Sequence, residues 1–246
     1  MRRSYGQRES ERLERTPFSF STPRLTEGMS QTDTRNNADL EVALGYAVGS
    51  DRHVFESTFL LDRELANAVA ASSEPMIGQL RLAWWRDALS GTSAATRDSA
   101  LVASIRELWP EGGHELVFLI DAWEAFATAP ELTTSIVDRF ISERASMGAI
   151  LAEHLDIPVT KRVVDQAMRD WVCADLAAHL TSEEERQLVL SLWAKSKSAR
   201  QSLPRRLRPL AVLSALGQRA LNEGGRAMMG ARSDALLALR TGMFGR

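Results

Sequence analysis

Three side chains in the last third of the sequence have the types and spacing of a metal site. Asp175, His179 and Glu183 follow one another at intervals of four residues, and helical residues four positions apart share one face. Carboxylate and imidazole groups are common ligands of divalent cations. The pattern indicates a carboxylate, imidazole, carboxylate row that would hold a metal ion if one helix runs through all three residues.

The residues just before Glu183 favour a break in that helix. The sequence Thr-Ser-Glu-Glu at 181–184 fits a capping box in which Thr181 is the N-cap. A new helix starting there would swing Glu183 out of line with Asp175 and His179. Solvated side chains at helix ends are therefore the favoured interpretation, and a metal site is the alternative.

Other reactive residue types do not gather in a catalytic pattern. No serine or cysteine with a supporting acid stands near the remaining histidines, so triad chemistry has no support; these are His53, His114 and His154. The glycine pairs at 112–113 and 224–225 lack the lysine and the strand of a phosphate-binding loop. The six tryptophans lie within apolar stripes, which predicts core packing rather than ligand stacking.

The charge of the chain is unevenly distributed. The net charge of -2 over 246 residues does not suggest a nucleic-acid partner. Residues 195–246, however, hold 11 basic and 2 acidic residues, against 13 and 26 in residues 30–194. This basic C-terminal fifth faces either an anionic partner or the acidic remainder of its own fold.

The densest basic cluster in that fifth is Arg205, Arg206 and Arg208, which are flanked by prolines. A solvated turn is the favoured interpretation. Contact with a phosphate group or an anionic lipid is the alternative.

The number of cysteines and the hydropathy of the chain indicate the cellular compartment of the protein. Cys173 is the only cysteine, so an intramolecular disulfide is ruled out, which fits a reducing compartment. No run of about 18 apolar residues suits a transmembrane helix, and the N-terminus lacks the apolar core of a signal peptide. We expect a cytoplasmic protein, whose contact with the inner membrane, if any, is peripheral.

Hydrophobic periodicity predicts helices from Asp39 onward, among them 135–155, 160–180 and 183–197. Residues 55–89 read as two helices that meet at 72–75, because serine is a preferred N-cap and proline is accepted in a first turn. The first places Phe55, Leu61 and Leu65 on one face. The second is apolar over most of its circumference, which predicts a helix packed between others.

The alternating pattern of strands is absent, so the predicted fold class is all-α, with a single helical domain over residues 38–246. Residues 1–37 are polar without a sustained period, which predicts a disordered N-terminal extension. Translation from Met29 instead of Met1 is left open.

Two strings of residues carry a family resemblance. Leu-Asp-Arg-Glu-Leu-Ala at 61–66 and Ser-Glu-Pro-Met-Ile-Gly-Gln-Leu-Arg-Leu-Ala-Trp-Trp-Arg-Asp-Ala-Leu at 73–89 resemble the squalene/phytoene synthase family, with weaker similarity at 144–148 and 203–210. The resemblance implies an isoprenoid synthase-like helical bundle around a central cavity. We include Arg63 and Arg86, from these strings, with the basic cluster as ligand-binding candidates.

Active members of that family join two prenyl diphosphates head to head, with magnesium ions held by two facing aspartate-rich motifs. Several carboxylates are needed to bind such hard cations. Here the first motif falls just after Arg63, where residues 66–70 contain no carboxylate. Asp62 and Glu64 do not replace it, because two residues apart on a helix they point about 200° apart.

The second motif falls within residues 165–183 in one of two registers. One keeps Arg169 and Asp170, with Cys173 and Ala174 where further acids belong. The other is anchored on Trp171 and places the row of Asp175, His179 and Glu183 on the metal-ligand positions. In either register at least half of the magnesium site is missing.

The resemblance and the missing acids together predict a catalytically degenerate protein. We expect an assembly or chaperone role, since degenerate relatives include an assembly factor for respiratory complex I, or passive isoprenoid binding. The partner would be a protein or an isoprenoid lipid, with an anionic membrane as a peripheral contact, no nucleic acid and no cofactor. The alternative is a magnesium-dependent, head-to-head prenyl transferase that uses an atypical metal site at Asp175, His179 and Glu183.

Overall fold

Helices form every regular element in the part of the chain that the computed structural model describes, which is residues 38–70, 75–91, 99–111, 113–197, 199 and 202–245. The predicted all-α fold class is confirmed. The predicted disordered extension at 1–37 and most of the predicted turn at 72–75 lie outside the described residues.

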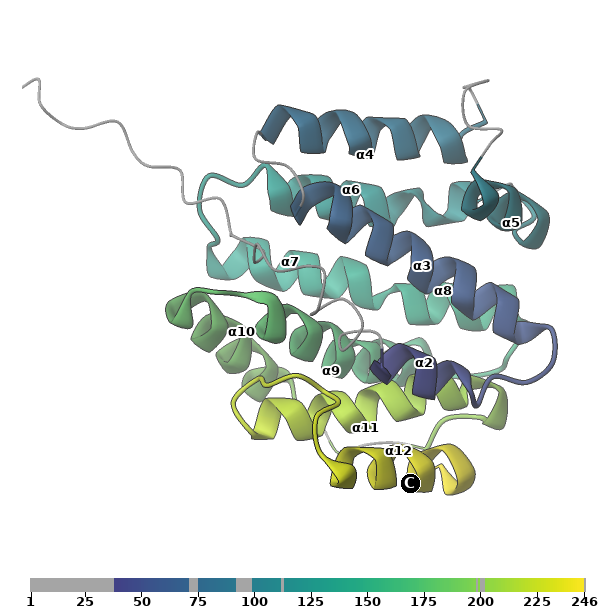
Figure 1. The fold of residues 1–246 in the computed structure, drawn as a ribbon, viewed down its shortest axis with the longest axis vertical. Helices are drawn as coiled ribbons and strands as arrows, with labels where there is room; N and C mark the ends of the chain where they lie inside the picture. Colours follow the sequence, from purple (N-terminus) through teal and green to yellow (C-terminus); the bar gives the residue numbers. More distant parts are fainter. Residues whose placement is uncertain are drawn as a thin grey trace, which may run out of the picture.

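The helices are stacked in layers, from α4 at one end of the molecule to α12 at the other (Figure 1). Their bounds, in chain order, are α2 (Ala38–Leu44), α3 (Asp51–Ala70), α4 (Pro75–Leu89), α5 (Ala100–Leu108), η2 (His114–Leu116), α6 (Val117–Ala127), α7 (Thr134–Ala145), α8 (Met147–His154), α9 (Lys161–His179), α10 (Glu183–Ser196), η3 (Arg205–Leu207), α11 (Arg208–Asn222) and α12 (Arg232–Phe244).

Helix α9 lies at the centre of the packing, where it contacts α7, α8, α10 and α11. Its approach to α11 is close enough to require a glycine. A Cβ atom on Gly217 would lie 2.6 Å from the carbonyl oxygen of Asp170, so the two backbones touch there. This contact sets the spacing of α9 and α11 beside Asp170.

Helix α4 is less buried than the sequence predicts. It packs against α3 and α6 through one face, on which Leu82 and Ala88 are fully buried. The other face is exposed: the exposed fractions of Met76, Ile77, Leu80 and Trp84 are 69%, 40%, 65% and 36%. The prediction that this helix packs between others is wrong, because no described element covers the second apolar face.

Candidate functional site

A buried arginine links the two helices on which the resemblance places the metal-binding motifs. Arg144, in the last turn of α7, is 3% exposed. Its Nε and Nη2 atoms donate to the carboxylate of Asp62 on α3, at 2.9 and 2.6 Å. Its Nη1 atom lies 2.7 Å from Oδ2 of Asp175 on α9. One guanidinium thus bridges α3 and α9.

Aromatic rings enclose this guanidinium. Its central carbon lies 4.7 Å from the ring centroid of Trp171, 5.2 Å from that of Trp123 and 6.0 Å from that of Phe140. Trp123 also donates its indole N–H to Asp62 at 2.9 Å. The rings hold the cation by cation–π attraction and exclude water, which strengthens the ion pairs.

The ion pairs set the charge state of the cluster. Burial opposes the charge on Arg144, but Asp62 and then Asp175 keep the pKa of its guanidinium above the usual value. Burial alone would raise the pKa of Asp175, but the charge of Arg144, and less strongly that of His179, holds that pKa below its usual range. Asp175 is therefore ionised and paired.

A third carboxylate, Asp39 on α2, lies beside this cluster. It accepts a hydrogen bond of 3.2 Å from the indole N–H of Trp171. Burial, together with the charge of Asp175, raises the pKa of Asp39 to about 7. A gap of about 10 Å³, lined in part by Asp39, Asp175 and His179, has room for a single water molecule.

The structure brings together two of the three residues in the predicted metal-binding row. Nδ1 of His179 lies 3.4 Å from Oδ1 of Asp175 and 2.7 Å from the carbonyl oxygen of the same residue. Glu183 instead opens α10, where it is paired with Arg186 at 2.6 Å.

The break between α9 and α10 agrees with the expected capping sequence, shifted by one residue. The N-cap is Ser182, whose hydroxyl accepts from the backbone N–H of Glu185, and not Thr181. Among the described residues, no three His, Cys, Asp or Glu side chains are grouped as metal ligands.

The donor set of the cluster does not suit a magnesium ion. Mg²⁺ requires near-octahedral oxygen ligands. The carboxylates of Asp62 and Asp175 already neutralise one guanidinium, and a ring nitrogen of His179 contacts its own helix backbone. A metal ion would have to displace the side chain of Arg144.

The other register of the second motif includes Asp170, whose side chain connects α9 with α10 and α11. Its carboxylate accepts from Trp193 at 2.9 Å and from Ser214 and Gln218 at 2.8 Å each. Burial raises the pKa of Asp170, and these hydrogen bonds oppose the rise. The neighbouring Arg169 is bonded to side chains of α7 and α10.

The candidate arginines are not gathered at one site. Arg63 lines a pocket of about 290 Å³ between α2 and α3, and Arg86 pairs with Asp121 and Glu124 of α6. The basic cluster is also divided. Arg206 pairs with Asp51 at 2.7 Å, Arg208 donates to the carbonyl oxygen of Thr241 at 3.2 Å, and Arg205 is exposed.

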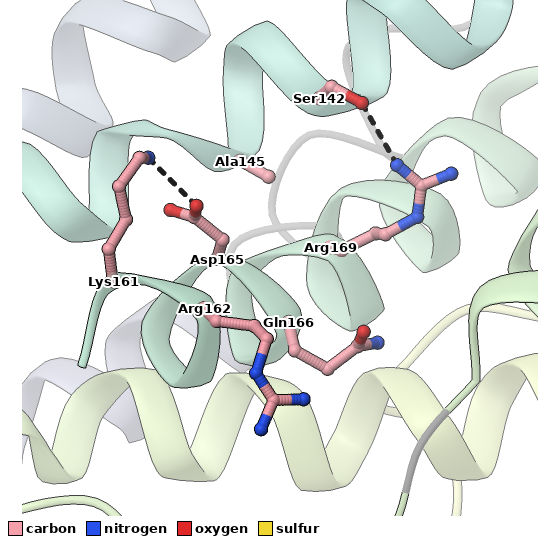
Figure 2. Close-up of a pocket in the computed structure, with 7 residues that line it drawn as sticks. All are labelled: Ser142, Ala145, Lys161, Arg162, Asp165, Gln166 and Arg169. Atoms are coloured by element: carbon pink, nitrogen blue, oxygen red, sulfur yellow. Dashed lines mark hydrogen bonds and ion pairs between the residues drawn. The ribbon is translucent and has the colours of Figure 1, made fainter.

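A pocket that the sequence did not indicate lies between α7 and α9 (Figure 2). It measures about 400 Å³ and is lined by Ser142, Ala145, Lys161, Arg162, Asp165, Gln166 and Arg169. Figure 2 shows that Lys161 and Arg169 are bonded to neighbouring side chains. Six of the seven lining residues have polar or charged side chains, but none of these is a nucleophile paired with a base.

The site residues that the sequence did not indicate are Arg144, its partner Asp62, and Asp39, which is bonded to Trp171 beside them. Their signal is a charged residue on an otherwise apolar face: Asp62 adjoins the Leu61 and Leu65 stripe. Such a residue needs an opposite charge or a hydrogen-bond donor when it is buried.

Comparisons with protein-family models, with curated proteins and with solved structures found no match to this chain. The resemblance to the squalene/phytoene synthase family and the expected central cavity therefore stay predictions.

Proposed function

We propose that this chain is a catalytically degenerate protein of the squalene/phytoene synthase type, which acts by binding rather than by prenyl coupling. The observation that carries the proposal is the Arg144 guanidinium, ion-paired with Asp62 and Asp175. In an active synthase, facing acidic motifs hold metal ions that pull on a diphosphate. One guanidinium paired with both carboxylates offsets one of their two negative charges and occupies the space between them.

The packing around Arg144 supports the same proposal. The rings of Trp123, Phe140 and Trp171 surround the guanidinium, and Phe59 packs edge-on against Trp171 at 5.2 Å. A prenyl chain next to this cation would have to displace several buried rings. The buried centre thus favours a structural role for the cluster.

The binding role that the resemblance favours is assembly or chaperoning of a membrane-associated protein complex, as for the degenerate relatives that assemble respiratory complex I. Passive isoprenoid binding is the second form of a non-catalytic role. Native mass spectrometry of the purified protein distinguishes these two roles. A protein that binds isoprenoids is expected to retain a lipid, whereas an assembly protein needs none.

A turnover assay tests the loss of catalysis directly. Purified protein is incubated with farnesyl or geranylgeranyl diphosphate and Mg²⁺, and pyrophosphate release is measured. We expect no release above that of buffer. Release that is abolished in Asp175→Ala, with the fold of that variant checked by circular dichroism, overturns the proposal in favour of the prenyl transferase.

A deletion strain tests the assembly role. We expect reduced complex I activity, restored by the wild-type gene and equally by a His179→Gln, Glu183→Gln double variant. The double variant removes two of the predicted metal ligands but leaves the Arg144 ion pairs intact. Normal complex I activity in the deletion strain contradicts the assembly role, and restoration by the wild type alone contradicts the expectation that His179 and Glu183 are not needed for it.

A further inference from the structure

The last helix exposes an apolar stripe on its outer face. Helix α12 packs against α11 and α2 with Ala238, Thr241 and Gly242 turned inward, and a Cβ atom on Gly242 would clash with the Tyr46 ring. The side chains that point outward are large and apolar. Their exposed fractions are 66%, 48%, 60% and 63% for Leu236, Leu239, Met243 and Phe244.

The charged residues on this outer face are basic. Arg232 and Arg240 are exposed, and each lies four positions from Leu236, so both share its helix face. The one acid of α12, Asp234, is fully buried. It pairs with Arg219 of α11 and with Arg226, which lies between α11 and α12.

The basic cluster found in the sequence adjoins the C-terminal end of the same helix. Arg208 donates to the carbonyl oxygen of Thr241, which places the start of α11 beside the end of α12. Arg205, three residues earlier, is exposed. The apolar stripe is therefore accompanied by positive charge near both ends.

We propose that the outer face of α12 docks on an anionic lipid bilayer, with its apolar side chains among the acyl chains and its arginines at the headgroups. An exposed helix face that combines leucine, methionine and phenylalanine with arginine has the composition of an interfacial surface. Negative lipid headgroups attract such arginines. Figure 1 places α12 at the end of the stack, where no described helix lies outside it.

The exposed face of α4 provides the contrast. Its apolar residues Met76, Leu80 and Trp84 lie at the opposite end of the molecule (Figure 1) and are accompanied by both Arg81 and the acidic Asp87. Charge complementarity with a negative surface thus singles out α12. The docking goes beyond the proposed function, since it depends on neither catalysis nor a protein partner.

Vesicle flotation of the full chain tests the proposal. We expect binding to vesicles of equal parts phosphatidylcholine and phosphatidylglycerol, and much weaker binding to phosphatidylcholine alone. The double variant Leu236→Glu, Leu239→Glu is expected to lower the partition about tenfold or more, since it removes two apolar contacts. Arg232→Glu is expected to lower it as well, and added salt to weaken wild-type binding.

The matched control is Leu80→Glu, which places the same substitution on the exposed face of α4 and is expected to bind as the wild type does. Circular dichroism confirms the fold of each variant. Equal binding to both kinds of vesicle, no binding, or an equal loss in Leu80→Glu overturns the proposal. A dimer in sedimentation velocity that the α12 double variant abolishes also overturns it, because the stripe then contacts a second copy. None of these outcomes changes the turnover assay above.

Discussion

Asp62 and Arg144 are charged residues on apolar helix faces, and each is tolerated there because the other neutralises it. A buried ion pair adds little compared with well-packed apolar residues, but removing one partner leaves an uncompensated charge. The indole N–H of Trp123 supplies a further donor to Asp62. The pair therefore links α3 to α7 through side chains.

Substitution of Arg144 tests this account. We expect Arg144→Met to lower the free energy of unfolding by about 3–5 kcal/mol, because Asp62 stays buried without its cation. Urea denaturation measures the loss. The control Arg139→Met, on the same helix but with a 68% exposed side chain, is expected to cost less than about 1 kcal/mol. Adding Asp62→Leu to Arg144→Met should restore part of the stability, and a further loss would contradict the account.

The raised pKa of Asp39 makes stability depend on pH. Burial and the charge of Asp175 raise this pKa from 3.8 to about 7, so the folded protein holds a proton that the unfolded chain releases between these values. The contribution of Asp39 to stability is therefore greatest below about pH 4 and falls as the pH rises to about 7.

Asp39→Asn should remove that dependence, because the amide cannot ionise and its oxygen still accepts from Trp171. We expect the variant to gain stability relative to the wild type as the pH rises from about 4 to 7, by at most about 4 kcal/mol. Thermal unfolding at a series of pH values measures the difference. A difference that does not change with pH would contradict the assignment.

At the scale of helices, the sequence predicted most elements well, because apolar periodicity and capping residues depend only on neighbouring positions in the chain. The predicted helix at 160–180 is α9 (Lys161–His179), and that at 183–197 is α10 (Glu183–Ser196). One continuous helix was expected over 135–155, but it breaks at Ser146. There the hydroxyl donates to the carbonyl oxygen of Glu143 at 2.6 Å, a local competition that apolar periodicity does not report.

Periodicity alone also misplaced α4, because an apolar face indicates that burial is favourable and not that a neighbour exists. A matched pair of substitutions tests the structure here. Leu82 is fully buried, so Leu82→Ala is expected to cost about 2–5 kcal/mol of unfolding free energy. Leu80 is 65% exposed, so Leu80→Gln is expected to change it by less than about 0.5 kcal/mol. Urea denaturation of both compares them, and similar losses would contradict the edge position of α4.

At the scale of the whole molecule, the basic C-terminal fifth is only partly paired with the acidic remainder of the fold. Arg206 pairs with Asp51 of the acidic part, whereas Arg226 pairs with Asp234 inside the fifth. Arg232 remains exposed on α12. Composition could not divide these roles, because pairing depends on which residues the tertiary fold brings together. The same reason hid the contact of Arg144 with Asp62, which are 82 positions apart.

The layered packing predicts a gradient of stability across the molecule. Helices α9 and α11 are buried on most of their surface and touch at Gly217, whereas α4 and α12 each leave one face exposed. Amides at the centre of such a stack open only with global unfolding, and those in end helices open locally. We expect hydrogen exchange, followed by mass spectrometry, to be slowest in α9 and α11 and faster in α4 and α12. Exchange in α4 as slow as that in α9 would contradict the edge position, since it requires a cover over Met76 and Leu80. Added anionic vesicles should slow exchange in α12 and leave α4 unchanged, because the exposed apolar face of α12 is accompanied by exposed charges that are all basic, whereas that of α4 includes the acidic Asp87.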